Sequence, residues 1–381
     1  MYFQIFLMYF QISSFVSQAQ IEKEVGSETY GFDAIRGTQA GREFYVAMCP
    51  LKIIPKLFIF NDYDIPPELR AQRVLKESRI PAIKNYILNN PKDYIFSSLT
   101  ASVDGAMKFF GAPSLGEDAK LGRLYINMDA KLLINDGQHR RKAIEEALKE
   151  KPTLGKEMIS VVFFRDDGLR RSQQMFSDLN KNAIKPTKSL NILYDHRDDF
   201  HQFVVGLTNS IDAFKHRVDL EKTTISNRST KAFTLNGITD ASMKLLGVKK
   251  IKSFTSNDKE KIKTFWKQVS KNIPEWQLLI QRKITPFELR KNYVNTNTNL
   301  LNALGIFGRV LIQNNPDDWE LVLRNLKKID WSRDAPEWEN RLIKHGQMQK
   351  QTAGIELAAN MILQKCGVKL SAERQKIEAK L

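Results

Sequence analysis

One segment of the sequence, residues 132–144, predicts a sheet strand that turns abruptly into a helix. An apolar run ends at Ile134, and a polar turn follows it. Apolar residues then recur with the helical period of about 3.6, among them Ile144 and Ala147. Asp136 stands where the N-cap of this helix is expected. The segment is therefore expected to join a strand and a helix through one sharp polar turn.

The charge of this segment is unusual for a helix start. Arg140, Arg141 and Lys142 crowd the first helical turn. The helix dipole already places partial positive charge there, so each cation is disfavoured by roughly 0.3–1 kcal/mol. An anion at the helix end would offset that cost, and phosphate is the simplest candidate. The turn is therefore predicted to bind a phosphate group.

Length and composition set wider limits. The 381 residues are enough for two domains or one large domain. Hydrophobic residues make up 42% and charged residues 27%, which predicts a buried core. Lysine and arginine number 59 against 43 acidic residues, giving a net charge of +16. That excess favours a polyanionic partner, with nucleic acid ahead of an anionic membrane.

Cysteine and histidine usage argues against a metal centre. Cys49 and Cys366 stand far apart, which speaks against a disulfide framework and against a cysteine-rich zinc site. The five histidines show no metal-binding spacing such as H-E-x-x-H. The sequence therefore predicts no structural metal, and a reducing cytoplasm fits best.

Residues 1–29 are predicted to be an extension outside the folded core. Met1 to Ile5 recurs as Met8 to Ile12, and the first basic residue is Lys23. This apolar start is interrupted by polar residues and is too short to span a bilayer. A signal peptide or an anchor is the alternative that the sequence leaves open.

The rest of the chain is predicted to be α+β, with a mixed-sheet domain at 30–230 and a basic helical domain at 231–381. Strands and helices alternate irregularly in the first domain, which argues against a regular doubly wound sheet. Strands are expected at 42–48, 57–60, 94–103, 124–127, 132–135 and 159–164, with 124–127 and 132–135 paired around Asp129-Ala130. Helices are expected at 169–179 and at 66–88, the latter broken at Pro81. Five tryptophans are expected to pack the helical domain.

A second polar cluster lies at the exit of the helix predicted at 169–179. Its members carry amides, a carboxylate and amines: Asp178, Asn180, Lys181, Asn182 and Lys185. The simpler interpretation is a C-cap, in which amides and lysines satisfy the last carbonyls. The functional interpretation is a second wall of the phosphate site.

Three groups of basic residues are predicted to contact DNA phosphates. Arg36 and Arg42 flank glycines near the start, and the polar run 221–231 is rich in hydroxyls, amides and bases. An ordinary solvated loop is the alternative for that run. Residues 244–291 carry thirteen lysines and arginines against four acids. The predicted contacts in the last two groups are Lys222, Arg228, Lys231, Lys249, Lys250, Lys252, Lys261, Lys263 and Lys267.

Several ordered stretches of the chain resemble one protein family. The run Asp136-Gly137-Gln138-His139-Arg140 is the name motif of the DGQHR-domain proteins. The other stretches are 34–45, 66–73, 172–180 and 189–197. Together they resemble the DndB proteins of bacterial DNA phosphorothioation systems, over about residues 30–245 and more weakly beyond. Ala232 departs from the family pattern, which favours Leu there, and the repeat before residue 22 is foreign to it.

The resemblance implies a negative transcriptional regulator that binds promoter DNA of its own gene cluster and is not needed for sulfur transfer itself. It also implies a core similar to the ParB and sulfiredoxin fold, in which a polar-basic motif at a helix start holds nucleotide phosphates. On this chain those positions are Gly137, Gln138, His139, Arg140 and Arg141. ATP or CTP, with Mg²⁺, is then the expected ligand, and it would switch the affinity for DNA.

Two other functions stay open at this point. The first is an enzyme, an ATPase or DNA nickase, in which Asp136 orients a metal or water, His139 acts as acid or base and Arg140 stabilises developing charge. The second is a scaffold that contacts other proteins of the phosphorothioation machinery through the helical domain. A bacterial cytoplasmic homo-oligomer that does not contact the membrane is expected. No helix-turn-helix stands out, so the sequence names no recognition helix.

Overall fold

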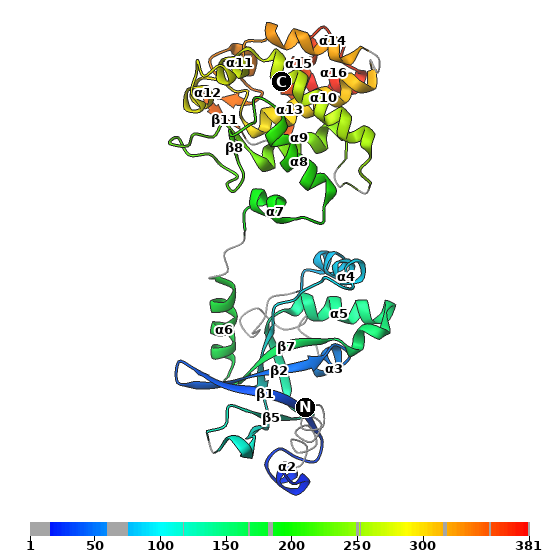
Figure 1. Cartoon of the computed structure of the whole chain (residues 1–381), viewed down its shortest axis with the longest axis vertical. Coiled ribbons are helices and arrows are strands. Elements are labelled where there is room, and N and C mark those ends of the chain that lie inside the picture. Colours follow the sequence, from blue (N-terminus) through cyan, green and yellow to red (C-terminus); the bar gives the residue numbers. More distant parts are fainter. Residues whose placement is uncertain are drawn as a thin grey trace, which may run out of the picture. The chain divides into compact units, whose positions relative to one another are not determined.

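The computed structural model describes residues 16–58, 75–116, 118–166, 168–181, 186–248, 251, 253–314, 318–349 and 352–379. The chain divides into two compact units, Met1–Ile184 and Lys185–Leu381 (Figure 1). The first is built on a mixed seven-stranded sheet, and the second consists mainly of helices. The predicted α+β class with a helical C-terminal region is therefore confirmed.

The sheet of the first unit has the strand order β4-β5-β1-β2-β7-β3-β6. Its strands are β1 (Thr29–Gln39), β2 (Arg42–Pro50), β3 (Leu99–Asp104), β4 (Met107–Gly111), β5 (Leu121–Asn127), β6 (Lys131–Asp136) and β7 (Met158–Arg165). β3 runs parallel to β7, and the other neighbours are antiparallel. Buried and less buried residues alternate along β5 and β7, as expected for strands with one face on a core. All of β3 but its last residue is buried, which places it inside the unit.

Two very short connections force this sheet to curl. β3 passes into β4 across residues 105–106, and β5 passes into β6 across residues 128–130. Both connections join strands from opposite ends of the sheet order. Because three residues span only about 10 Å, the two ends of the sheet must meet. Gly105 permits the bend, with φ +147° and the Cβ of Ala130 only 2.6 Å from where its own Cβ would stand.

The bend explains why the predicted pairing of 124–127 with 132–135 is wrong. β5 pairs with β1 and β4, whereas β6 pairs with β3. β3 and β4 form one bent arm of a long hairpin, and β5 and β6 form the other. The turn at Asp129 therefore redirects the chain along its own arm and does not fold it back.

Three other expectations for this unit need correction. Leu57 ends the short helix α3 (Ile54–Leu57) and is not in a strand, while residues 59–60 lie outside the described residues. Pro81 stands in the first turn of α4 (Ile80–Asn89), where its missing N–H costs nothing, so it starts the helix and does not break it. Residues 66–74 lie outside the described part. The strand expected from residue 94 begins only at Leu99.

The first unit contains further helices. They are α2 (Gln18–Glu24), α5 (Gln138–Glu150), α6 (Leu169–Lys181) and the 3-10 turns η2 (Glu77–Arg79), η3 (Pro113–Leu115) and η4 (Pro152–Lys156). α5 packs against α3 and α4 and buries Ile144 and Ala147, as its period predicted.

The described part of the predicted N-terminal extension belongs to this unit. Ile21 and Val25 are buried, and the amide of Asn127 donates to the Val25 carbonyl at 2.7 Å. Glu24 forms an ion pair with Lys108 at 2.7 Å. Residues 16–29 are therefore packed on the sheet, and the leading repeat lies outside the described residues.

The second unit contains ten α-helices among its described residues. They are α7 (Lys188–Tyr194), α8 (Asp199–Ser210), α9 (Leu235–Leu246), α10 (Ser256–Asn272), α11 (Pro274–Ile280), α12 (Pro286–Asn292), α13 (Thr298–Asn314), α14 (Trp319–Val322), α15 (Thr352–Lys365) and α16 (Ala372–Glu378). Shorter elements are β8 (Val218–Asp219) with β9 (Phe233–Thr234), β10 (Ile343–Lys344) with β11 (Gln347–Met348), and the 3-10 turns η5 (Leu323–Lys328) and η6 (Pro336–Trp338).

The core of this unit is formed around α13, which packs against α9 and α15. All five tryptophans are buried, which confirms their predicted packing role. Trp266 also donates its indole N–H to the Ser242 hydroxyl at 2.9 Å. Residues 186–230 belong to this unit because α7 and α8 pack against α9, so the division falls earlier than the boundary predicted at 230/231. No described helix is both long and apolar enough to cross a membrane.

Both cysteines are free and buried, one in each unit. Burial raises the pKa of the Cys49 thiol to about 12 and that of Cys366 to about 12. Neither thiol therefore ionises near neutral pH, and the two residues act as packing groups.

The close approach of α13 to α9 can be tested with two glycines. A Cβ at Gly305 would lie 2.2 Å from the Ala241 carbonyl oxygen, whereas Gly206 in α8 has open space around it. We expect Gly305→Ala to lower the free energy of unfolding by about 1–3 kcal/mol through overpacking. Gly206→Ala should raise it by about 0.5–1 kcal/mol, because alanine favours the helix. Urea unfolding followed by tryptophan fluorescence measures this unit, and equal effects of the two changes would contradict the packing.

Candidate functional site

The turn between β6 and α5 has the predicted strand-to-helix geometry, with one correction at its cap. β6 ends at Asp136, and α5 begins at Gln138. Gly137 is the N-cap residue, with φ +104° in the left-handed region, so Asp136 is not the N-cap. A Cβ at Gly137 would also lie 2.3 Å from Cδ2 of Leu99. Only glycine therefore satisfies both the backbone angle and the space at this corner.

The three cations at the start of α5 all have protein partners. Arg140 pairs with Asp136 at 2.7 Å and donates to Ser97 and to the Ser98 carbonyl. Arg141 pairs with Glu145 and donates to the Pro55 carbonyl. Lys142 pairs with Glu145 and Glu146. Their charge is thus offset within the chain, and the dipole argument no longer requires an external anion. Nucleotide binding at this turn stays a prediction.

Glu145 and Glu146, which pair with Arg141 and Lys142, are held in their ionised form. Burial alone would raise the pKa of Glu145, but the hydrogen bond from Lys142 and the charges of Arg141 and Lys142 lower it below its usual value. The same hydrogen bond raises the pKa of Lys142. α5 is therefore an internally neutralised helix, in which i, i+3 and i, i+4 pairs follow one another along the surface.

His139 and Gln138 occupy two different environments. Nε2 of His139 lies 3.1 Å from the backbone nitrogen of Lys76 and accepts its hydrogen bond. The ring nitrogen that would act as a base is therefore engaged with the backbone. Gln138 is buried, and its amide nitrogen has no hydrogen-bond partner among the described residues. The catalytic roles predicted for Asp136, His139 and Arg140 stay untested.

A buried polar network connects the turn to α6. Asn135 is fully buried and accepts a hydrogen bond from the Ser102 hydroxyl at 3.0 Å. Its amide nitrogen lies 3.5 Å from the Ser172 carbonyl oxygen. The Ser172 hydroxyl in turn donates to Asp166 at 3.0 Å. β3, β6 and the first turn of α6 are thus held in register by hydrogen bonds that water does not reach.

Of the residues predicted to form a second wall of the phosphate site, only Asp178 has a described side chain. α6 ends at Lys181, and exposed Asp178 accepts a hydrogen bond from Gln174 at 2.7 Å. Asn182 and Lys185 lie outside the described residues, as do the side chains of Asn180 and Lys181. Their roles as C-cap or phosphate ligands stay predictions.

Near the start of the chain, the predicted DNA contacts Arg36 and Arg42 lie on the β1–β2 hairpin. Ala40 and Gly41 both have positive φ, which is typical of the tight turn closed by the Gln39–Arg42 pair. The guanidinium of Arg36 lies 3.5 Å from Glu43 and donates to the Ala119 carbonyl at 3.2 Å. Arg36 is therefore partly committed to structural contacts.

In the second unit, one arginine holds the loop at 221–231. Arg290 of α12 donates to the Lys231 carbonyl and to the carbonyls of Ser226, Asn227 and Ser229. Lys231 donates its amine to the His216 carbonyl at 2.9 Å, so this predicted DNA contact has a structural bond. Lys222 and Arg228 are exposed on the same loop. The loop is thus fixed through its backbone while two of its cations face solvent.

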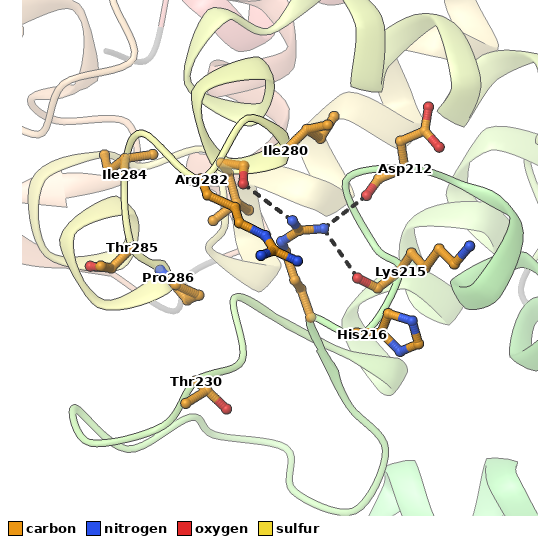
Figure 2. Close-up of a pocket in the computed structure, with 11 residues that line it drawn as sticks. Asp212, Lys215, His216, Thr230, Ile280, Arg282, Ile284, Thr285 and Pro286 are labelled. Atoms are coloured by element: carbon orange, nitrogen blue, oxygen red, sulfur yellow. Dashed lines mark hydrogen bonds between the residues drawn. The ribbon is translucent and has the colours of Figure 1, made fainter.

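Beside this loop lies a basic pocket of about 540 Å³ (Figure 2). Arg217 donates to the carbonyls of Asp212, Lys215 and Leu279, and its pKa is lowered by burial and by the nearby charge of Arg282. Figure 2 shows Arg282 extending toward Lys215 and His216. Arg282 and His216 both have φ near +60°. Left-handed residues other than glycine are strained, and such strain clusters at functional sites.

A row of lysines follows one side of α10, and it is called the lysine ridge below. Its members are Lys259, Lys263, Lys267 and Lys271, and the last three are exposed. They lie at i, i+4 spacing, so their amines line one side of the helix over about 18 Å. Lys261, predicted to contact DNA, is partly buried on this helix. Lys249, Lys250 and Lys252 lie outside the described residues.

One group of described residues could hold a metal ion. Single ligand atoms of Asp195, Asp198 and His201 lie within 4.8 Å of one another. Asp198 caps α8 by accepting from the backbone of Phe200 and His201, and Nδ1 of His201 lies 3.2 Å from Asp195. Capping and hydrogen bonding account for this arrangement without a metal.

Comparison with protein families identifies the relatives of the chain. A family model described as DndB, DNA-sulfur modification-associated, matches residues 32–369. The chain belongs to the DndB family. Comparisons with curated proteins and with solved structures found no match. The predicted resemblance is confirmed, and the DndB match extends it through the helical unit. Membership associates the chain with DNA sulfur modification, while the likeness to the ParB and sulfiredoxin fold stays a prediction.

Some basic residues of this DndB chain were missed by sequence reasoning. Arg165, Arg171, Arg217, Arg282 and Arg290 were not proposed as site residues, yet the structure gives each a defined place in a pocket or loop. Arg165, Arg171 and Arg217 stand alone or in a pair, without the density of the run at 244–291. Arg282 and Arg290 lie within that run, but nothing in the sequence distinguishes them from its other basic residues. A basic residue directly after an apolar strand, as at Arg165, was the one available signal.

The geometry of the turn in this DndB chain predicts an unequal response of two glycines. Gly137 and Gly168 both have positive φ, but only Gly137 has a neighbour in the path of a Cβ. We expect Gly137→Ala to lower the free energy of opening of β6 and α5 by about 3 kcal/mol. Gly168→Ala should lower the free energy of opening at the start of α6 by about 1–2 kcal/mol, because only backbone strain acts there. Hydrogen exchange of peptides from 131–150 measures the first effect, and protection unchanged in Gly137→Ala would contradict it.

Proposed function

We propose that this chain is a DNA-binding regulator of a DNA sulfur-modification gene cluster, and that its helical unit contacts duplex phosphates. The observation that carries the proposal is the lysine ridge on α10. Family membership supports an association with DNA sulfur modification. The role as a negative regulator at its own promoter is what the resemblance to DndB proteins implies.

The lysine ridge is unfavourable for the isolated chain. Like charges at i, i+4 destabilise a helix by about 0.2–0.5 kcal/mol for each pair. The acidic residues on α10 form no ion pair with these lysines among the described residues. Asp258 closes the capping box, and Glu260 accepts a hydrogen bond from Thr264 at 3.1 Å. A polyanion would remove this repulsion, and the release of its counterions would drive binding.

The loop at 221–231 supports the same function. Arg290 fixes its backbone before any ligand binds, and exposed Lys222 and Arg228 extend from it. Phosphate contacts of this kind position a protein on a duplex without reading its sequence. Preference for the promoter sequence would then come from base contacts, for which the sequence indicates no recognition helix.

The turn at Gly137 supports a binding role over the alternative of an ATPase or DNA nickase. Asp136 is paired with Arg140, and Nε2 of His139 accepts a backbone hydrogen bond. A general base needs an acceptor that can take a proton from substrate. We therefore propose nucleotide binding without catalysis at this turn's residues, in which ATP or CTP with Mg²⁺ binds the first unit and changes the affinity for DNA.

The salt dependence of DNA binding tests the lysine ridge. We expect log K for a duplex to fall linearly with log salt, with a slope of about −0.9 for each phosphate contacted. Changing Lys263, Lys267 and Lys271 together to glutamine should make the slope less steep by about 3. The charge-matched control changes exposed Lys131, Lys151 and Lys156 of the first unit. An equal change of slope in both variants would show that the ridge is not the contact.

The regulatory role is tested by sequence preference. We expect the chain to bind a duplex from the promoter of its own gene cluster at least about tenfold more tightly than an unrelated duplex at equal salt. Addition of ATP or CTP with Mg²⁺ should change that affinity. Fluorescence anisotropy measures both effects. Equal affinities with and without nucleotide would contradict the proposal that a nucleotide controls DNA binding.

A further inference from the structure

We propose that a pocket in the first unit binds the phosphate groups of a small nucleotide. Three arginines from β2, β7 and α6 line it, namely Arg42, Arg165 and Arg171, and the group is called the arginine pocket below. The inference does not rest on DNA binding by the helical unit. It places the small ligand away from the turn at Gly137, whose cations already have protein partners.

The fold brings these arginines together from distant parts of the sequence. β2 and β7 pair with Phe44 opposite Phe164, so Glu43 and Arg165 are the next residues along the two antiparallel strands. α6 begins soon after β7, and its first turns carry Arg171 and Met175 on one side at i, i+4 spacing. The buried network through Ser172 fixes that part of α6 against the sheet.

The acidic residue beside the arginine pocket is already engaged. Glu43 accepts a hydrogen bond from the Tyr45 hydroxyl at 2.7 Å and lies 3.5 Å from the guanidinium of Arg36. Burial and the hydrogen bond to Glu43 raise the pKa of Tyr45 to about 12, so its hydroxyl stays neutral. Glu43 therefore balances Arg36, and it forms no ion pair with Arg165 or Arg171 among the described residues.

Two arginines of the arginine pocket, Arg165 and Arg171, have N–H donors that make few hydrogen bonds within the protein. Arg165 donates one hydrogen bond, to the Met107 carbonyl at 3.2 Å. Nε of Arg171 is buried without a hydrogen-bond partner among the described residues. A buried donor that water cannot reach favours a ligand that supplies an acceptor. The planar fork of a guanidinium matches two oxygens of a phosphate group, so several arginines suit a polyphosphate.

The size and walls of the arginine pocket favour a nucleotide over a bare ion. Its volume is about 350 Å³, within the usual range of small-molecule sites. Phe164, Met175 and the buried ring of Tyr45 give it an apolar side next to the arginines. A polar end for phosphates and an apolar wall for a sugar and base are thus found in one cavity.

Calorimetric titration of the full chain with three probes tests the ligand class. The probes are ATP, sodium triphosphate and adenosine. We expect ATP to bind best, triphosphate to bind more weakly, and adenosine to show no measurable binding. Because charge drives the contact, ATP affinity should fall as salt rises. Equal binding of ATP and adenosine, or no binding of ATP at millimolar concentration, would overturn the proposal.

Two adjacent arginines of α6 locate the site. Arg171 lines the arginine pocket, whereas exposed Arg170 does not. We expect Arg171→Gln to weaken ATP binding at least about tenfold and Arg170→Gln to change it less than about twofold, values typical of losing one charge-assisted contact. Arg171→Lys keeps the charge but loses the fork, and should fall between them.

Two further measurements keep this test decisive. Circular dichroism and thermal unfolding establish that Arg171→Gln is folded, and Arg165→Gln serves as the second pocket variant if it is not. His139→Ala separates the pocket from the turn. Loss of ATP binding in His139→Ala together with full binding in Arg171→Gln would assign the nucleotide to the turn and overturn the arginine pocket. DNA binding by the lysine ridge would be unaffected by that result.

Discussion

The bend shared by the two arms of one long hairpin determines most of the first unit. Gly105 and the short connection at 128–130 turn β3–β4 and β5–β6 at the same place. The bend lets β5 pair with β1 while β6, only three residues later, pairs with β3 at the opposite end of the sheet. The end of β6, and with it Gly137 and the start of α5, is positioned by this closure.

The structure shows two contrasting ways of accommodating excess positive charge. On α5, cations are neutralised by carboxylates one turn away and by carbonyls from other segments, so the helix is electrostatically complete. On α10, the lysine ridge forms no ion pair among the described residues. In the arginine pocket, Arg165 and Arg171 lie beside Glu43, which pairs with Arg36. Stability explains the first arrangement. The second lowers stability, and a bound anion is the physical condition under which it becomes favourable.

Local features were predictable from the sequence, and long-range ones were not. The strand, the sharp turn and the helix around Gly137 follow from periodicity and turn chemistry within a few residues. The carboxylates that offset Arg140 and Arg141, Asp136 and Glu145, stand at i, i+4 spacing, so this part of the charge balance could have been predicted from the sequence. The carbonyl partners at Ser97 and Pro55 are separated from these arginines by tens of residues, and no spacing reveals them. The same limit applies to Arg165 and Arg171, which only strand register and helix packing bring beside Arg42. The pairing of β5 and β6 was mispredicted for a related reason, since a three-residue connection does not say whether the chain reverses or bends.

The four carbonyls that Arg290 gathers have a consequence for the kinetics and entropy of association. A polar loop without regular secondary structure normally samples many conformations, and a partner must order it on contact. Here the side chain of Arg290 holds residues 226–231 through four of their carbonyls within the folded chain. The entropic penalty of association at this loop is correspondingly small, and its backbone carbonyls are turned toward Arg290. Under the proposed function, a polyanion would meet a preordered loop on which the repelling oxygens are occupied by Arg290, so binding would require little rearrangement.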